Sequence, residues 1–254
     1  MSLLTTSREI AGAITRGLVD PKHRAPRKFA ILGGYLASGL RLARGMTVKR
    51  SALGPRPEKR LVLWDFERCP HSRTVREALS ALDLDVDVKP CPKGGTRFRP
   101  QLEGGRGVPQ LDDPNTGEHL TGSSRIIEHL YAKYGATKPP VLINATPVRI
   151  LTGLSARVLT AQRGATARPS KAPTQPLELY SFEASPYCRF VRFVLCELEL
   201  PYVLYNRGKG SPRRKDFLEQ HGKLQFPYLR DPNTGWEGFE SQDIEAYLER
   251  TWAQ

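Results

Sequence analysis

Residues 61–79 read LVLWDFERCPHSRTVREAL, and residues 177–195 repeat this pattern as LELYSFEASPYCRFVRFVL. The likeness continues downstream, where GVPQLDDPNTG (107–117) is matched by QFPYLRDPNTG (225–235) and TGSSRIIEHL (121–130) by FESQDIEAYL (239–248). Each copy therefore carries the same motifs in the same order over roughly 75 residues. A repeat of this length predicts two domains of one fold.

The two copies differ just before their first predicted helix. Cys69, Pro70, His71 and Ser72 in the first copy correspond to Ser185, Pro186, Tyr187 and Cys188 in the second. At the leading position of this motif one copy has a thiol and the other a hydroxyl. Thiol–disulfide exchange requires a thiolate, so this difference is the main sequence clue to function.

The cysteine content indicates a reducing compartment. The chain has 254 residues and four cysteines, which are too few and too irregular for a secreted disulfide framework. No cysteine pair has zinc-site spacing, so we predict no metal site. We expect a cytoplasmic protein. A plastid or other organelle is the alternative, because residues 1–50 are rich in arginine and poor in acids, as transit peptides are.

The positive charge is concentrated outside the repeats. The net charge is +13, yet residues 1–60 hold thirteen Lys/Arg against three acids, and residues 137–176 hold six against none. These two segments are predicted to contact an anionic surface such as membrane headgroups, or to be solvated connecting chain. They lack interleaved aromatic residues and any reader motif, so specific nucleic-acid binding is not expected. No apolar run is long enough to span a membrane.

The repeat extends upstream of the main motif. ILGGYLASGLRLARG (31–45) resembles ILTGLSARVLTAQRG (150–164), and both gather apolar residues on one helical face. We predict docking helices at 29–45 and 147–163. The predicted division of the chain is a basic segment (1–60), a first domain (61–136), a basic linker (137–176) and a second domain (177–254).

Within each copy, strands and helices are predicted to alternate. In order, the expected elements are strands 61–66 and 177–182, helices 70–82 and 186–198, strands 86–90 and 202–205, and helices 96–104 and 212–220. A third strand follows each of the Val108-Pro109 and Phe226-Pro227 steps, and the Asp-Pro-Asn-Thr-Gly turn joins it to a fourth. Last helices at 123–134 and 241–252 begin after a serine cap. This order predicts an α/β fold with a mixed sheet.

These motifs together resemble the thioredoxin fold, and in particular the glutaredoxin-like N-terminal domain of glutathione S-transferases. Two such domains in one chain are similar to a small group of tandem proteins from plants, algae and bacteria. The resemblance covers residues 61–136 and 177–253 and implies glutathione as co-substrate. It also exposes a difference, because glutathione transferases follow this domain with an all-helical domain, for which this chain has no counterpart.

Cys69 is the predicted nucleophile. It precedes a helix whose exposed N–H groups stabilise an anion, and Arg68, His71, Arg73 and Arg76 add positive charge nearby. The resemblance implies that Ser72 stands where dithiol enzymes keep a resolving cysteine, so exchange would follow a monothiol route. Cys91, at the end of the next strand, is an alternative resolving residue, although two residues at one sheet edge are often too far apart to bridge.

The resemblance implies a glutathione site around Cys69. Pro70 begins the helix, Val108-Pro109 matches a cis-proline step that pairs with the cysteinyl backbone of glutathione, and Ser123 and Ser124 stand at the start of the last helix, where a carboxylate binds. Gly122 departs from the family, which places Glu or Gln before that serine. Both serines could alternatively serve as helix caps.

The second copy keeps the residues before its last helix that the family has, but it lacks the cysteine before its first helix. Glu240-Ser241 keeps the transferase pattern, Phe226-Pro227 keeps the backbone clamp, and Ser185 stands where serine-type transferases hold the glutathione thiol. Cys188, one turn inside the helix, is either a resolving thiol or a buried core residue.

Three functions are compatible with these residues. The first is a glutathione-dependent thiol–disulfide oxidoreductase acting at Cys69 on small or protein mixed disulfides. The second is a redox-inactive thioredoxin-fold module that binds partners. The third is glutathione transfer at Ser185.

Overall fold

The computed structural model describes residues 45–105, 107–140 and 163–254. The first domain contains, in order, β1 (Leu61–Asp65), α3 (Pro70–Ala81), β2 (Val86–Pro90), β3 (Gln110–Asp113), β4 (Glu118–Thr121) and α4 (Ser123–Tyr134). β1 runs parallel to β2 and antiparallel to β3, which pairs with β4. This is the mixed sheet expected of a thioredoxin-like domain.

The second domain repeats this arrangement with one additional helix. Its elements are β5 (Leu177–Ser181), α6 (Pro186–Glu197), β6 (Tyr202–Asn206), α7 (Arg214–His221), β7 (Tyr228–Asp231), β8 (Trp236–Phe239) and α8 (Ser241–Trp252). The strand pairings match those of the first domain. The predicted α/β fold with two tandem thioredoxin-like domains is therefore confirmed, and the described residues hold no all-helical domain.

The helix predicted at 96–104 is wrong. The structure has two short 3-10 turns there, Arg99–Gln101 and Glu103–Gly105. Gly104 has a φ of 64°, which lies outside the helical region, and Pro100 occupies one of the turns. The corresponding segment of the second domain has no such interruption and forms α7 as predicted. The predicted docking helices, 29–45 and 147–163, lie almost entirely outside the described residues.

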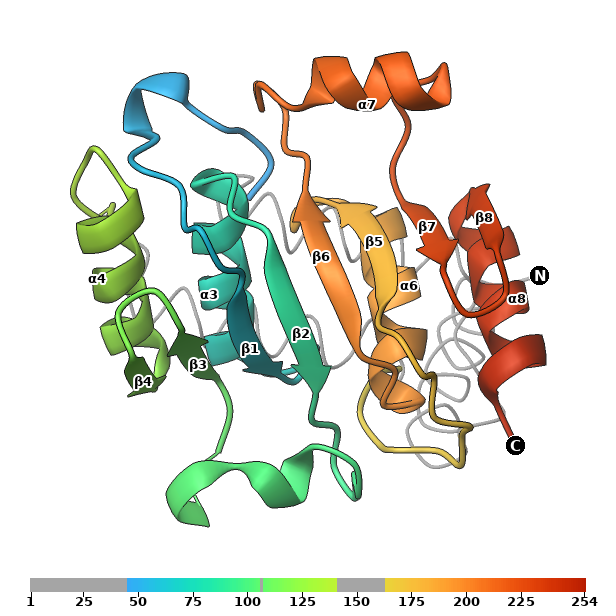
Figure 1. Ribbon diagram of the computed structural model, residues 1–254. Helices are drawn as coiled ribbons and strands as arrows, with labels where there is room; N and C mark the ends of the chain where they lie inside the picture. The colour runs from blue at the N-terminus through green and yellow to red at the C-terminus, as the bar shows by residue number, and fades with distance from the viewer. Residues whose placement is uncertain (1–44, 106, 141–162) are drawn as a thin grey trace, which may run out of the picture.

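The two domains form one continuous sheet. The strand order is β4-β3-β1-β2-β6-β5-β7-β8, with β2 and β6 antiparallel at the centre (Figure 1). Asp87 pairs with Val203, the residue that corresponds to it in the second copy. On either side of this pair, Val86 pairs with Leu204 and Val88 with Tyr202, so each residue faces the counterpart of the other. This register gives the two domains a pseudo-two-fold relation. Figure 1 shows α3 and α6 behind the strands, with α4 and α8 toward the two ends of the sheet.

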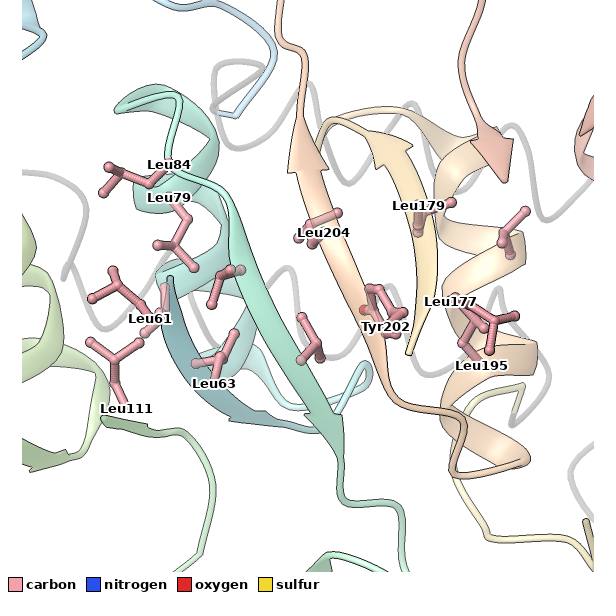
Figure 2. Packing of buried hydrophobic residues seen from close by; sticks show 14 of the residues in the cluster. Leu61, Leu63, Leu79, Leu84, Leu111, Leu177, Leu179, Leu195, Tyr202 and Leu204 are labelled. Atoms are coloured by element: carbon pink, nitrogen blue, oxygen red, sulfur yellow. The ribbon is translucent and has the colours of Figure 1, made fainter. Parts of the chain in front are cut away.

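The cores of the two domains belong to one hydrophobic cluster. Figure 2 shows Leu61, Leu63 and Leu79 on one side and Leu177, Leu179, Leu195 and Leu204 on the other. In β2 the apolar side chains of Val86 and Val88 are buried, whereas those of Asp87 and Lys89, which alternate with them, are only partly buried. This alternation follows from the two-residue period of a strand, which directs one face toward α3.

The chain before each domain crosses to the other domain. Residues 46–48 exchange backbone hydrogen bonds with Lys209, which follows β6, at N···O distances of 2.7 Å. Residues 165–167 do the same with Lys93, which follows β2, at 3.0 and 2.8 Å. These two reciprocal contacts tie the domains together beyond the central strand pair.

The repeated Asp-Pro-Asn-Thr-Gly turn has a structural role in both domains. The side-chain amide of Asn115 accepts a hydrogen bond from the backbone N–H of Lys59 and donates one to its carbonyl oxygen. Asn233 forms the same two hydrogen bonds with Gln175. The aspartates accept hydrogen bonds from the last helices: Asp113 from Tyr134, and Asp231 from Tyr247 and Trp252. The turn thus joins connector, sheet and final helix, which explains its presence in both copies.

A buried cluster of charges lies between the domains. Arg76 on α3 contacts Glu183 of the second domain at 3.0 Å, and Arg192 on α6 contacts Glu67 of the first at 2.9 Å. Each arginine also pairs with the glutamate of its own repeat, at 3.3 and 2.9 Å. No more than 2% of any of these four side chains is exposed. Arg76 corresponds to Arg192 in the repeat, and Glu67 corresponds to Glu183, so the cluster follows the same pseudo-two-fold relation.

This cluster predicts a loss of stability in acid. Burial alone would raise the pKa of Glu183, but the guanidinium groups of Arg192 and Arg76 lower it to about 2, against an ordinary value of 4.5. A lowered pKa in the folded state stabilises the protein above pH 4.5, and this contribution, about 3 kcal/mol, is lost as the pH falls from 4.5 toward 2. Urea unfolding at pH 7 and pH 3 should show about 2 kcal/mol of this loss, because pH 3 still lies about one unit above the lowered pKa. A Glu183→Gln variant should lose less stability over this interval, and an equal loss would contradict the assignment.

Candidate active site

Cys69 lies where the sequence predicted it, immediately before α3. It is the N-terminal capping residue, with extended backbone (φ −73°, ψ 121°), and Pro70 follows as the first helical residue. Its side chain is half-buried, and Sγ lies 3.7 Å from the carbonyl oxygen of Val108. The thiol therefore stands beside the N–H groups of a helix start, where an anion is stabilised, and retains access to solvent.

Two of the arginines expected to support Cys69 are engaged elsewhere, which corrects that expectation. Arg76 donates to both carboxylate oxygens of Asp65 at 2.7 Å and to Glu183. Arg73 pairs with Glu77, four residues along the helix, at 3.2 Å. Their positive charge is thus largely balanced by carboxylates. The contact with Glu183 could not be predicted because Glu183 comes from the other domain, whereas the i, i+4 spacing of Arg73 and Glu77 already allows their pairing.

The two predicted proline steps are both in the cis form: Val108-Pro109 and Phe226-Pro227. Val108 is half-buried and Pro109 is buried. The carbonyl oxygen of Val108 faces Cys69 Sγ, so the structure brings the predicted nucleophile and the predicted backbone clamp together.

The start of α4 completes this group, with one correction. Gly122 (φ 87°) is the capping residue and Ser123 is the first helical residue, so neither serine is the cap predicted from sequence. Ser123 is buried and its Oγ lies 3.3 Å from Nδ1 of His71, whereas Ser124 is exposed. The His71–Ser123 contact was not predicted. It links the helix that carries Cys69 to the proposed carboxylate site.

The side chains of Ser185 and Cys188, at the corresponding helix start of the second domain, are buried. Ser185 is only 5% exposed, and its hydroxyl accepts a hydrogen bond from the backbone N–H of Cys188 at 3.3 Å. Cys188 is fully buried. Ser185 is therefore a buried helix cap in this structure, and the transferase activity predicted at this residue stays a prediction.

Glu240 and Ser241 keep the predicted positions at the start of α8. Glu240 is the capping residue, has a φ of 60° and pairs through its carboxylate with Gln225, while Ser241 is buried. The ring of Phe226 lies tilted against that of Phe217, with 4.9 Å between ring centroids, so aromatic side chains pack beside the second proline step.

Neither Cys91 nor Cys188 is suited to a resolving role. Cys91 is fully buried, and burial raises the pKa of its thiol to about 12, so the thiolate is scarce at neutral pH. Burial likewise raises the pKa of Cys196. Since exchange requires a reachable thiolate, the structure disfavours the predicted resolving roles of Cys91 and the buried Cys188.

The described part of the chain holds no group of three or more His, Cys, Asp or Glu side chains arranged to bind a metal ion. Among the same residues, no helix combines the length and hydrophobicity that crossing a membrane requires.

The fold and site define a pair of thioredoxin-like domains with one accessible thiol. The family model for the glutathione S-transferase N-terminal domain matches the chain twice, at residues 63–139 and 179–254. The chain belongs to this family. A solved structure described as "Leishmania TDR1 - a unique trimeric glutathione transferase" is similar at 12% identity and a TM-score of 0.28, covering 77% of this chain and 68% of that one. No curated protein matches.

Proposed function

We propose that the protein is a glutathione-dependent thiol–disulfide oxidoreductase with Cys69 as its nucleophile. The supporting observation is the half-buried Cys69 thiol at the start of α3, 3.7 Å from the Val108 carbonyl. The other three cysteines are buried. Membership of a glutathione transferase domain family supports glutathione as the co-substrate.

The reaction proceeds in two exchanges. The Cys69 thiolate attacks the glutathione sulfur of a mixed disulfide, the other thiolate leaves and takes up a proton, and glutathione remains bound to Cys69 through a new disulfide. A second glutathione thiolate then attacks the glutathione sulfur of this adduct. Oxidised glutathione leaves and the Cys69 thiolate is regenerated, so the substrate is reduced and two glutathione molecules are joined as the disulfide.

The residues around Cys69 have distinct roles in this scheme. Val108 and Pro109 present backbone to the cysteinyl part of glutathione, as an added strand would pair. Ser123 and the exposed Ser124, at the start of α4, receive the γ-glutamyl carboxylate, which the positive end of the helix attracts. Pro70 leaves the helix start without a competing N–H.

The second domain, whose Ser185 and Cys188 are buried, fits the alternative of a binding module and would support the first domain or present substrates such as protein mixed disulfides. All four cysteines are free, in keeping with a reducing compartment such as the cytoplasm. The basic segments 1–60 and 137–176 are proposed to contact anionic surfaces, and most of both lies outside the described residues.

The decisive experiment measures glutathione-dependent reduction of the mixed disulfide between glutathione and 2-mercaptoethanol. We expect turnover above the uncatalysed rate, and mass spectrometry of protein treated with the substrate alone should show one glutathione, attached to Cys69. A Cys91→Ser variant should retain the wild-type rate. No turnover would favour the binding-module alternative, and glutathione on another cysteine would contradict the assignment of the nucleophile.

A further inference from the structure

Glu199 of the second domain holds the backbone of the loop that follows β2 in the first. Its carboxylate accepts hydrogen bonds from the backbone N–H groups of Thr96 and Arg97, at 3.0 and 3.1 Å. The Arg97 guanidinium in turn donates to the backbone carbonyl oxygen of Glu199 at 2.6 Å. Glu199 is 5% exposed, and a Cβ at Gly95 would lie 2.6 Å from a carboxylate oxygen, so a larger residue there would displace the carboxylate. A buried carboxylate of one domain thus fixes a loop of the other.

This loop lies at the end of the sheet that carries Cys69. Because β1 and β2 are parallel, both end at the same edge, where Cys69 follows β1 and the loop follows β2. Figure 1 shows the loop beyond the ends of these two strands. We call residues 93–103 the strap. Within the strap, the side chain of Gln101 donates to the carbonyl oxygen of Arg97 at 2.7 Å, which ties the part held by Glu199 to the part that follows.

The far end of the strap is fixed beside the first cis-proline step. The side-chain amide of Gln110 accepts a hydrogen bond from the backbone N–H of Glu103 at 3.2 Å and donates one to its carbonyl oxygen at 3.3 Å. Gln110 directly follows the cis Val108-Pro109 step, and the Val108 carbonyl oxygen lies 3.7 Å from Cys69 Sγ. Hydrogen bonds therefore connect the strap to the backbone that faces the thiol.

The reciprocal contact, from the first domain to the second, does not hold backbone. Asp83 corresponds to Glu199 in the repeat, and its carboxylate contacts Nε of Arg213, the counterpart of Arg97, at 3.0 Å. Pro212 precedes Arg213 and has no N–H to donate. The chain after this contact forms α7 of the second domain and leads away from the Cys69 site. Asp83 therefore makes a similar contact between the domains without reaching the candidate active site.

We propose that Glu199 is a positioning residue for the glutathione site of the first domain, a role that rests on the proposed function of Cys69. By fixing the start of the strap, Glu199 keeps Glu103 against Gln110 and so holds the Val108-Pro109 backbone where a glutathione moiety pairs with it. The second domain thereby contributes to substrate binding in the first domain without contacting the substrate. The effect falls on binding and leaves the thiol chemistry unchanged.

A Glu199→Gln variant tests this role, because its amide group turns a donor toward one of the two N–H groups that the carboxylate accepts. We expect the KM for the mixed disulfide between glutathione and 2-mercaptoethanol to rise about fivefold, with kcat within about twofold of the wild type. Hydrogen exchange followed by mass spectrometry needs no turnover. It should be about fivefold faster in residues 101–110, beyond the N–H groups that Glu199 contacts. An unchanged KM, or unchanged exchange in 101–110, would overturn the proposal.

Two further variants separate this effect from general loosening of the fold. Asp83→Asn weakens the reciprocal contact and should lower the melting temperature, while the KM and the exchange of residues 101–110 stay at the wild-type values. Arg97→Met keeps a long side chain but loses the guanidinium contacts with the second domain. It should raise the KM as Glu199→Gln does, and it tests the role if Glu199→Gln fails to fold. An equal rise in Asp83→Asn, or no rise in Arg97→Met, would contradict positioning by Glu199. Faster exchange in Glu199→Gln without any turnover in the wild type would count against the proposed function alone.

Discussion

A Cys69→Ser variant is expected to lose at least about 100-fold of the glutathione-dependent reductase rate, because a hydroxyl cannot carry out thiol–disulfide exchange. The fold should survive the change. Ser185 occupies the equivalent position in the second domain and caps α6 by accepting a hydrogen bond from Cys188. A serine at position 69 can cap α3 in the same way, and such caps typically contribute about 1 kcal/mol. The variant should therefore be folded and inactive.

The matched control is Ser185→Ala. It removes the cap of α6, so stability should fall by about 1 kcal/mol while the reductase rate at Cys69 stays at the wild-type value. Rates come from the glutathione reductase-coupled assay, and stabilities come from urea unfolding. Wild-type activity in Cys69→Ser would place the reaction at another cysteine. Loss of activity in Ser185→Ala, with its fold intact, would restore a catalytic role for the second domain.

The sequence predicts the order of elements in each domain because each one is marked by local chemistry. Pro70 and Pro186 mark helix starts, since proline is tolerated where no N–H partner exists. The Asp-Pro-Asn-Thr-Gly turns mark the hairpins between the last two strands of each domain. The exception is 96–104, whose charged composition suggests a helix although Pro100 and Gly104 interrupt it.

The joining of the two sheets is not predictable in the same way. Alternation in β2 identifies the face that packs on α3 but gives no information about which strand lies at its free edge. The charge cluster is easier to recognise in the sequence. Glu67, Arg73 and Arg76 recur in the second copy at the same spacing, although Arg68, Thr74 and Glu77 beside them are replaced. From sequence alone the arginines look like local support for Cys69, because a partner across the domain boundary cannot be inferred from one strand or helix.

The central charge cluster should also determine the stability of the whole protein. Arg192 contacts Glu67 at 2.9 Å, Glu183 at 2.9 Å and the hydroxyl of Ser181 at 3.3 Å. Removing one member of a buried ion-pair group leaves uncompensated charge, which typically costs about 3–5 kcal/mol. Arg192→Met keeps a long side chain, so the loss reports charge rather than a cavity. We expect this variant to lose about 4 kcal/mol of unfolding free energy.

Urea unfolding followed by tryptophan fluorescence and circular dichroism measures this loss. Trp64 reports on the first domain, and Trp236 and Trp252 report on the second. Because the cluster and the β2–β6 pair join the domains, both signals should shift together to lower urea concentration. Lys215→Met is the control, since Lys215 and Glu219 form an ion pair with side chains 81% and 63% exposed, and solvent screens such pairs. If Arg192→Met cost no more than Lys215→Met, or shifted only the second domain, the cluster would not couple the two domains.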